Sequence, residues 1–147
     1  MSDTRKQLEG SVEHAVGMVA FLDGLTGYGS VSEMVEDWRQ TIEETGEYPE
    51  WDIEDAEELA REDDIFSVLD TWALDTYAVV HRRGTDELVH SHVIVFGTGG
   101  PHIEAEVRTT GGVEVRGYWG SDRLARPMTA GNLADWLTEL AESGFVA

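Results

Sequence analysis

The 147-residue sequence contains no cysteine, which excludes disulfide bonds, cysteine-ligated zinc sites and thiol nucleophiles. It also lacks any apolar run that approaches the roughly 20 residues of a membrane-spanning helix. The first residues, Met1 to Lys6, lack the apolar stretch of a secretory signal peptide. We therefore expect a cytoplasmic protein that makes no contact with a membrane. A chain of this length buries roughly 70% of its unfolded surface, so it is long enough to form a core.

Basic residues are scarce, with 10 against 30 acidic residues, and the net charge is −20. This charge repels nucleic-acid phosphates and anionic lipids, so we expect no binding to duplex nucleic acid. Lys6 is the only lysine. An acidic surface almost without lysine is typical of proteins that work in molar salt, where the Debye length falls to about 3 Å and screens self-repulsion. The composition indicates an extreme halophile; the alternative is a low-salt protein whose acidity mimics nucleic acid.

The charge is distributed unevenly along the chain. Residues 1–75 hold 21 acids and 4 bases, a net charge of −17, whereas residues 76–147 hold 9 acids and 6 bases, a net charge of −3. One interpretation is that exposed helices carry the acids while the strands are mostly buried. The other is that the first half presents an acidic surface to a basic partner.

The first half of the chain has helical periodicity. Apolar residues three and four positions apart predict an amphipathic helix at the start of the chain. Ser30 followed by Glu33 has the pattern of a capping box, and Gly46 is placed to end the helix that follows. The predicted helical segments are residues 5–23, the segment from Ser30 to Gly46, a short segment opened by Asp52, and residues 65–74.

From Thr76 onward, the hydrophobic period changes to two. Four strands are predicted, over residues 76–82, 87–96, 102–109 and 113–119. Their short turns imply an antiparallel meander with one buried face. Thr129 is expected to cap a last helix. The predicted fold is α+β, a four-stranded antiparallel β-meander with a C-terminal helix packed on one face. An acidic N-terminal helical extension (residues 1–50) precedes the α+β core (residues 51–147) within one compact domain.

The predicted register yields one constellation on the polar face of the sheet. A three-residue turn pairs Glu106 with Arg116, and a symmetric Gly97–Pro101 turn places His92 opposite Glu106. Glu106 would then lie between His92 and Arg116. The functional interpretation is a proton-transfer or anion-binding site. The other is a set of solvated cross-strand ion pairs, each contributing about 0.2–1 kcal/mol. The same register also pairs Arg108 with Glu114, Glu104 with Tyr118, and His90 with Arg108.

A metal site is a second possibility on this face. His90, His92, His102 and Glu104 are the ligand types that zinc, nickel or iron accepts, although their convergence depends on the curvature of the sheet. Otherwise they are surface residues. The sequence contains no serine-hydrolase elbow, phosphate loop or His-Glu-x-x-His motif, and we predict no cofactor. Turn geometry accounts for the glycines between Gly97 and Pro101.

Two segments resemble a group of small, uncharacterised proteins from phages and other mobile elements. The segments run from His92 to Glu104 and from Val113 to Gly120. The turn motif Thr98-Gly99-Gly100-Pro101 lies between the strands predicted over residues 87–96 and 102–109. The resemblance covers residues of about 53–140, and the chain departs from the pattern between Arg123 and Pro127. It implies a sheet core and a mobile-element context but no reaction.

Two functions therefore stay open. The first is a non-enzymatic accessory or interaction protein, of viral or plasmid origin, that binds an unidentified protein partner. Its candidate contact residues are Tyr118, Trp119, Arg123 and Arg126, of types enriched at interface hot spots, although Trp119 could instead belong to the core. The second is a small metal-dependent or acid–base enzyme whose site residues are His90, His92, His102, Glu104, Glu106 and Arg116.

Overall fold

The structure is a computed structural model that describes residues 3–28, 30–49, 51, 53–59, 69, 73, 75–98 and 101–142. Its helices are α1 (Asp3–Leu25), α2 (Val31–Thr45), α3 (Ile53–Leu59) and α5 (Gly131–Glu142). Its strands are β1 (Asp75–Arg83), β2 (Asp86–Gly97), β3 (His102–Arg108), β4 (Gly112–Trp119) and β5 (Asp122–Thr129). Asp52 and most of the helix predicted over residues 65–74 lie outside the described residues.

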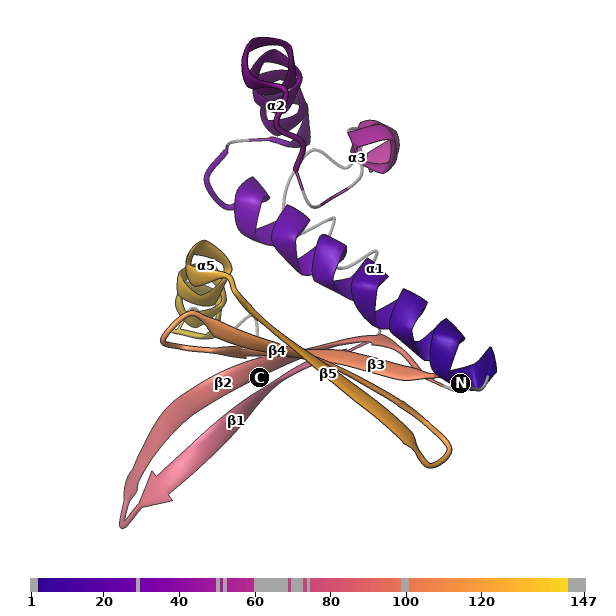
Figure 1. The fold of residues 1–147 in the computed structure, drawn as a ribbon. Coiled ribbons are helices and arrows are strands. Elements are labelled where there is room, and N and C mark those ends of the chain that lie inside the picture. Colours follow the sequence, from indigo (N-terminus) through magenta and orange to yellow (C-terminus); the bar gives the residue numbers. More distant parts are fainter. Residues whose placement is uncertain are drawn as a thin grey trace.

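The strands form one antiparallel sheet in the order β1-β2-β3-β4-β5 (Figure 1). The predicted α+β class is confirmed, but the prediction of four strands is wrong because β5 adds a fifth. This strand contains Pro127, which cannot donate a ladder hydrogen bond and which argues against a strand when the sequence is read alone. At the edge of a sheet a proline is tolerated. Gly120, with φ of 61°, supplies the left-handed residue of the short turn into β5.

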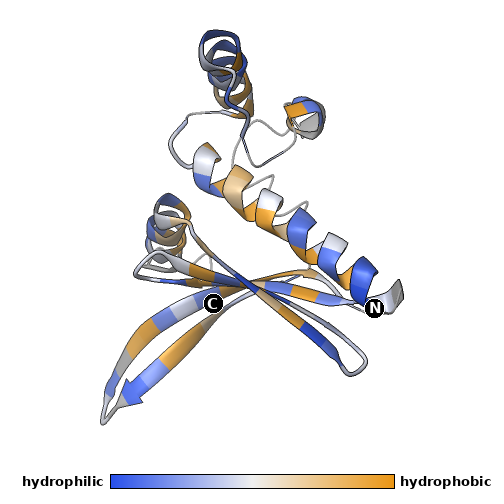
Figure 2. Ribbon diagram, in the orientation of Figure 1, coloured by the Kyte–Doolittle hydropathy of each residue, from blue (hydrophilic) through white to orange (hydrophobic). Residues whose placement is uncertain are grey.

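All described helices lie on the same side of the sheet (Figure 1). Helix α1 crosses β3, β4 and β5, and α5 packs against α1 and β3. Apolar and polar residues alternate along the strands (Figure 2), and the apolar set faces these helices. We call the opposite side of the sheet the helix-free face, since no described helix lies on it. The core is formed by one face of the sheet together with the helices, including Leu8, Val12, Ile94, Val115 and Leu137.

Close approach of α1 to the sheet depends on Gly117. A Cβ atom at this position would lie 2.7 Å from both Leu8 Cδ1 and Val12 Cγ2. Both of those side chains are fully buried. A larger residue at position 117 would therefore push α1 away from β4.

The caps confirm some predictions and correct one. The Ser30 side chain accepts a hydrogen bond from the Glu33 N–H over 3.2 Å, and Gly46 ends α2 in the left-handed conformation. The prediction that Thr129 caps the last helix is wrong, because Thr129 is the last residue of β5. The carboxylate of Asp23, from α1, instead accepts from the Leu133 N–H over 2.9 Å. One helix therefore caps the other, which fixes α5 against α1.

None of the described helices has the length and apolar composition that crossing a membrane would require.

Candidate functional site

The register between β3 and β4 determines which polar residues are neighbours on the helix-free face. Glu104 lies opposite Arg116, and Glu106 lies opposite Glu114. The predicted pairing of Glu106 with Arg116 is therefore wrong, as are those of Arg108 with Glu114 and Glu104 with Tyr118. The turn begins one residue earlier than predicted, because Gly111, with φ of 99°, takes its last position. The register between β3 and β4 therefore differs from the prediction by two residues, and Glu104, Glu106 and Arg116 still share one face.

The pairing of β2 with β3 differs from the prediction by an odd number of residues. Val93, not His92, lies opposite Glu106, and Ser91, not His90, lies opposite Arg108. The cause is an irregularity between Val95 and Gly97, which inserts one extra residue into β2 before the turn. A shift of one residue moves every side chain to the other face. His92 therefore points to the helix side, and Ser91 takes its place beside the carboxylates.

His92 is a buried core residue instead of a site residue. Its side chain is 0% exposed. Among the described residues, neither ring nitrogen has a hydrogen-bond partner. Burial lowers the pKa of His92, because the surroundings do not favour its charged form. The predicted constellation of His92, Glu106 and Arg116 is therefore not assembled.

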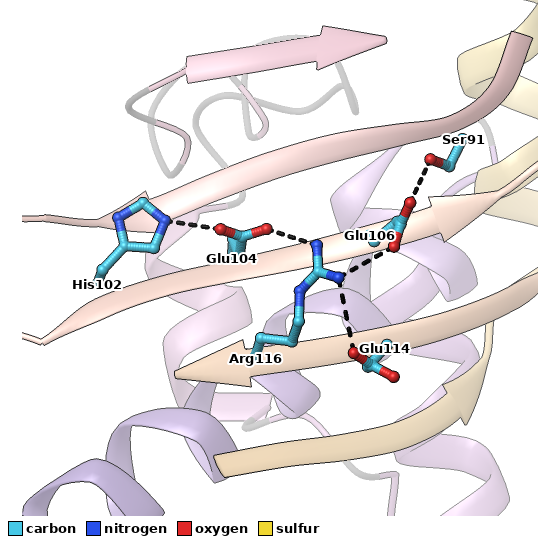
Figure 3. Close-up of polar contacts among 6 residues, drawn as sticks. All are labelled: Ser91, His102, Glu104, Glu106, Glu114 and Arg116. Carbon is cyan, nitrogen blue, oxygen red and sulfur yellow. Dashed lines mark hydrogen bonds and ion pairs between the residues drawn. The ribbon is translucent and has the colours of Figure 1, made fainter. Parts of the chain in front are cut away.

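Arg116 is the centre of the contacts that do form, with three carboxylates around it (Figure 3). Its Nη2 atom lies 2.6 Å from Glu104 Oε2, and its Nη1 atom lies 3.1 Å from Glu106 Oε1 and 3.6 Å from Glu114 Oε1. We call these three glutamates and Arg116 the carboxylate cluster. The side chains of Glu104 and Glu106 are 11% and 13% exposed, and that of Arg116 is 23% exposed. The expectation of fully solvated ion pairs is therefore wrong for Glu104, Glu106 and Arg116.

Two further side chains extend the carboxylate cluster along the sheet (Figure 3). The Ser91 hydroxyl donates to Glu106 Oε2 over 2.6 Å. At the other end, His102 Nε2 lies 2.8 Å from Glu104 Oε1. Ser91 and His102 therefore contact different carboxylates, with the Arg116 guanidinium between them.

The surroundings favour the charged forms of Glu106 and Arg116. The Ser91 hydrogen bond lowers the pKa of Glu106, and the charges of Arg116 and Arg108 act in the same direction against the opposing effect of burial. Burial disfavours the charged form of Arg116, but the hydrogen bond and charge of Glu104 outweigh it and raise the pKa of Arg116. Three carboxylates face one guanidinium within the cluster, so it has an excess of negative charge.

Two tyrosines flank the carboxylate cluster on the same face. Tyr77 of β1 lies in the row of Val93, Glu106 and Glu114, and its side chain is 41% exposed. Tyr118 of β4 lies opposite His102, with the Arg123 guanidinium 5.8 Å from its ring centroid. Aromatic rings and carboxylates are thus adjacent across the sheet.

The four predicted contact residues do not form one patch. Tyr118 and Arg123 pair across β4 and β5 on the helix-free face. Trp119 packs against the core on the other face, and Arg126 pairs with Glu13 of α1. Alternation along the strands separates them, because neighbours in sequence point to opposite faces.

The candidate metal ligands are also separated. His102 and Glu104 are in contact, whereas His92 lies on the opposite face and the His90 ring stacks on His81 with centroids 4.4 Å apart. The described part of the chain contains no group of three or more His, Asp or Glu residues arranged to hold a metal ion. Sequence reasoning missed Ser91, whose role depends on the extra residue in β2.

The turn motif lies beside a different feature. Thr98 and Pro101 line a cavity of about 790 Å³, and Gly99 and Gly100 are outside the described residues. The other walls are the Gln7–Met18 side of α1 and the aromatic rings of Phe96 and Trp119. This cavity lies on the helix side of the sheet and shares no residue with the carboxylate cluster.

Three comparisons, with family models, with curated proteins and with solved structures, found no match to this chain. Its function is therefore inferred from the geometry of the site, since a fold alone does not specify one.

Proposed function

We propose that this is a non-enzymatic interaction protein that binds a basic segment of another protein on the helix-free face. One observation carries the proposal: three glutamates surround a single arginine at the centre of a sheet face that no described helix covers. Two of these carboxylates are largely buried, so the sheet fixes their positions instead of leaving them to move in solvent. A partner that supplies a second cation would balance the charge.

The chemistry of the surrounding residues favours a guanidinium or ammonium group as that cation. Carboxylates accept short, charge-assisted hydrogen bonds from arginine, and tyrosine faces attract cations. Both groups are present here, and Arg123 over the Tyr118 ring shows the second contact within the protein itself. Glu114, which is 37% exposed, is the carboxylate that a partner reaches most easily.

The same contacts argue against nucleophilic catalysis. A serine nucleophile needs a base that can take its proton, and Ser91 donates to Glu106, whose lowered pKa makes it a weak base. The lowered pKa of Glu106 keeps it ionised, which makes it a poor proton donor near neutral pH.

The proposal also includes a setting. The scarcity of lysine and the net charge of −20 support the cytoplasm of an extreme halophile. The resemblance of residues of about 53–140 to phage and mobile-element proteins supports a viral or plasmid origin. In this setting the protein would act as an accessory factor.

A peptide-binding experiment tests the proposal. A fluorescent peptide of alternating Arg and Leu is titrated with the wild-type protein and with Glu114→Gln, and anisotropy is measured in the salt that keeps the protein folded. Glu43→Gln on the exposed side of α2 is the matched control, because it removes the same charge elsewhere. We expect Glu114→Gln to weaken binding about tenfold, as a charged hydrogen bond contributes about 1.5–3 kcal/mol. Equal effects of the two substitutions would contradict binding at the cluster.

The alternative is a small acid–base enzyme, favoured by the contact between His102 and Glu104. A carboxylate that orients an imidazole is half of a general acid–base pair. The test is turnover of a panel of ester and phosphoester substrates by wild type, His102→Gln and Glu104→Gln. Turnover in wild type that is lost in both variants would favour the enzyme.

A further inference from the structure

The outer edge of β1 differs from the other edge of the sheet. Strand β5 contains Pro127 and is partly covered by α1, where Arg5 Nη1 donates to the Arg123 carbonyl over 3.2 Å. Strand β1 has no proline and no lysine over its nine residues, and no described strand pairs with its outer side. The irregularity near Val79 adds the extra residue to β2, so β1 itself stays regular. Long, regular, unprotected edges are sites of further strand pairing.

Exposed apolar side chains concentrate at the same place. In the described residues, Tyr77 and Val80 of β1 are each 41% exposed, and Leu88 and Val89 of β2 are 63% and 39% exposed. Among the residues that the structure describes, the only other large apolar side chain exposed to this degree is Tyr48. Figure 1 shows that the β1–β2 hairpin extends beyond the helices. Within the described part of this acidic chain, exposed large apolar side chains therefore concentrate on the hairpin.

We propose that β1 pairs antiparallel with β1 of a second copy, which joins the two sheets into one of ten strands. A two-fold axis at Val79 is the register that uses all nine residues. It places Asp75 opposite Arg83 of the second copy, and Tyr77 opposite His81 of the second copy. On the other face Val80 lies opposite Ala78 of the second copy. The pairs of Asp75 with Arg83, Tyr77 with His81 and Ala78 with Val80 each occur twice. Thr76 lies opposite Arg82 of the second copy, also twice, and Val79 lies opposite its own copy.

Charge favours a second copy over an unrelated strand. Residues 75–90 hold 3 acids and 2 bases, so the hairpin is nearly neutral although the whole chain has a charge of −20. Two copies that meet there join through the part of the sheet that extends beyond the helices (Figure 1). Opposite-charge pairs directly across two strands stabilise the pairing, and like-charge pairs oppose it. The strand is self-complementary in this sense.

Sedimentation equilibrium of the full chain tests the proposal, in the lowest salt that preserves the circular dichroism of the folded protein. We expect a dimer in wild type. Asp75→Arg and Arg83→Asp should each raise the dimer dissociation constant about tenfold or more, because each converts two opposite-charge pairs into like-charge pairs. The double variant Asp75→Arg/Arg83→Asp should recover wild-type affinity. Glu139→Arg on the exposed side of α5 is the control for added positive charge.

The outcomes are separable. A wild-type monomer at all concentrations would overturn the proposal, as would single variants that dimerise like wild type. Failure of the double variant to recover would overturn the register at Val79 and with it the second copy as the fitted partner. Val80→Asp leaves the pairs of Asp75 with Arg83 intact but places a charge in the apolar contact, so it should also dissociate the dimer. Circular dichroism of this variant checks that its monomer is folded. Peptide binding at the carboxylate cluster is measured separately and does not depend on this result.

Discussion

Removal of Arg116 is the most direct perturbation of the carboxylate cluster. Arg116→Met keeps the length of the side chain and leaves Glu104 and Glu106 without the guanidinium that lies 2.6 Å and 3.1 Å away. Truncating one partner of a buried ion pair costs about 3–5 kcal/mol. Because these carboxylates are 11% and 13% exposed, water compensates in part, and we expect a loss of about 2–3 kcal/mol at pH 7.

The stability difference between wild type and Arg116→Met should depend on pH. In wild type, Glu106 has a lowered pKa, so its contribution to stability is present above the unfolded pKa near 4.3 and is lost as the pH falls through the folded value. In the variant, the Ser91 hydrogen bond still lowers the pKa of Glu106, but the charge and hydrogen bond of Arg116 no longer do so, and Glu106 binds protons more readily in the folded state than in wild type. The variant should therefore lose less stability on acidification than wild type. The difference between the two should narrow between about pH 7 and pH 4.

Denaturant unfolding at both pH values measures this difference. Arg123→Met is the matched control, because it removes the same charge from the same face but contacts a tyrosine ring instead of a carboxylate. We expect little change in the control, in line with an exposed cation. An Arg116→Met protein as stable as the control, or one with the same deficit at both pH values, would refute the view that the cluster is buried and charged.

Three further predictions address the core and the surface. Gly117→Ala should lower the free energy of unfolding by about 1–3 kcal/mol, because the added methyl group overpacks against α1. Gly10→Ala, whose Cβ would meet nothing within 4 Å, should raise it by up to about 1 kcal/mol. Equal effects of the two substitutions in urea unfolding would disprove the docking of α1 on β4. Burial lowers the pKa of His92, so wild type should lose stability as the pH falls below about 6.5, and His92→Leu should abolish that part of the loss in melting curves at two pH values. A pH profile unchanged in the variant would show that His92 is not the group responsible. Circular dichroism between about 2 M and 0.05 M salt should show loss of helix at low salt, because the acidic side chains of residues 30–62 repel one another when screening is removed. Unchanged helicity and an unchanged melting temperature would refute the halophile interpretation.

Periodicity and capping chemistry made the helices predictable. The segment predicted over residues 5–23 is α1, Asp3–Leu25, and the cap at Ser30 and the end at Gly46 lie where those residue types favour them. These signals are local, so one sequence suffices. The missed strand β5 shows the limit of local signals, because a proline is acceptable only once the strand is known to be at the edge.

Register was the part that the sequence did not reveal. A bulge depends on how two strands meet, and the single extra residue near Phe96 leaves no compositional mark. It exchanges His92 for Ser91 beside Glu106, which changes the chemistry of the face from a possible imidazole base to a hydroxyl donor. The register between β3 and β4, by contrast, differs from the prediction by two residues, so Glu104, Glu106 and Arg116 share one face as predicted, although their pairing differs.

Salt should affect the exposed acids of the N-terminal helices more strongly than the contacts within the carboxylate cluster. The acids of the N-terminal helices are mostly exposed, and at about 1 M salt a Debye length near 3 Å screens their long-range field. The carboxylate cluster lies in the half of the chain whose net charge is only −3, and its contacts are short and partly buried, so salt screens them much less. A basic partner drawn to the helices would therefore dissociate in molar salt. A partner bound through Glu114 and its neighbours should stay bound there, which makes binding at high salt the more specific sign of a site on the sheet.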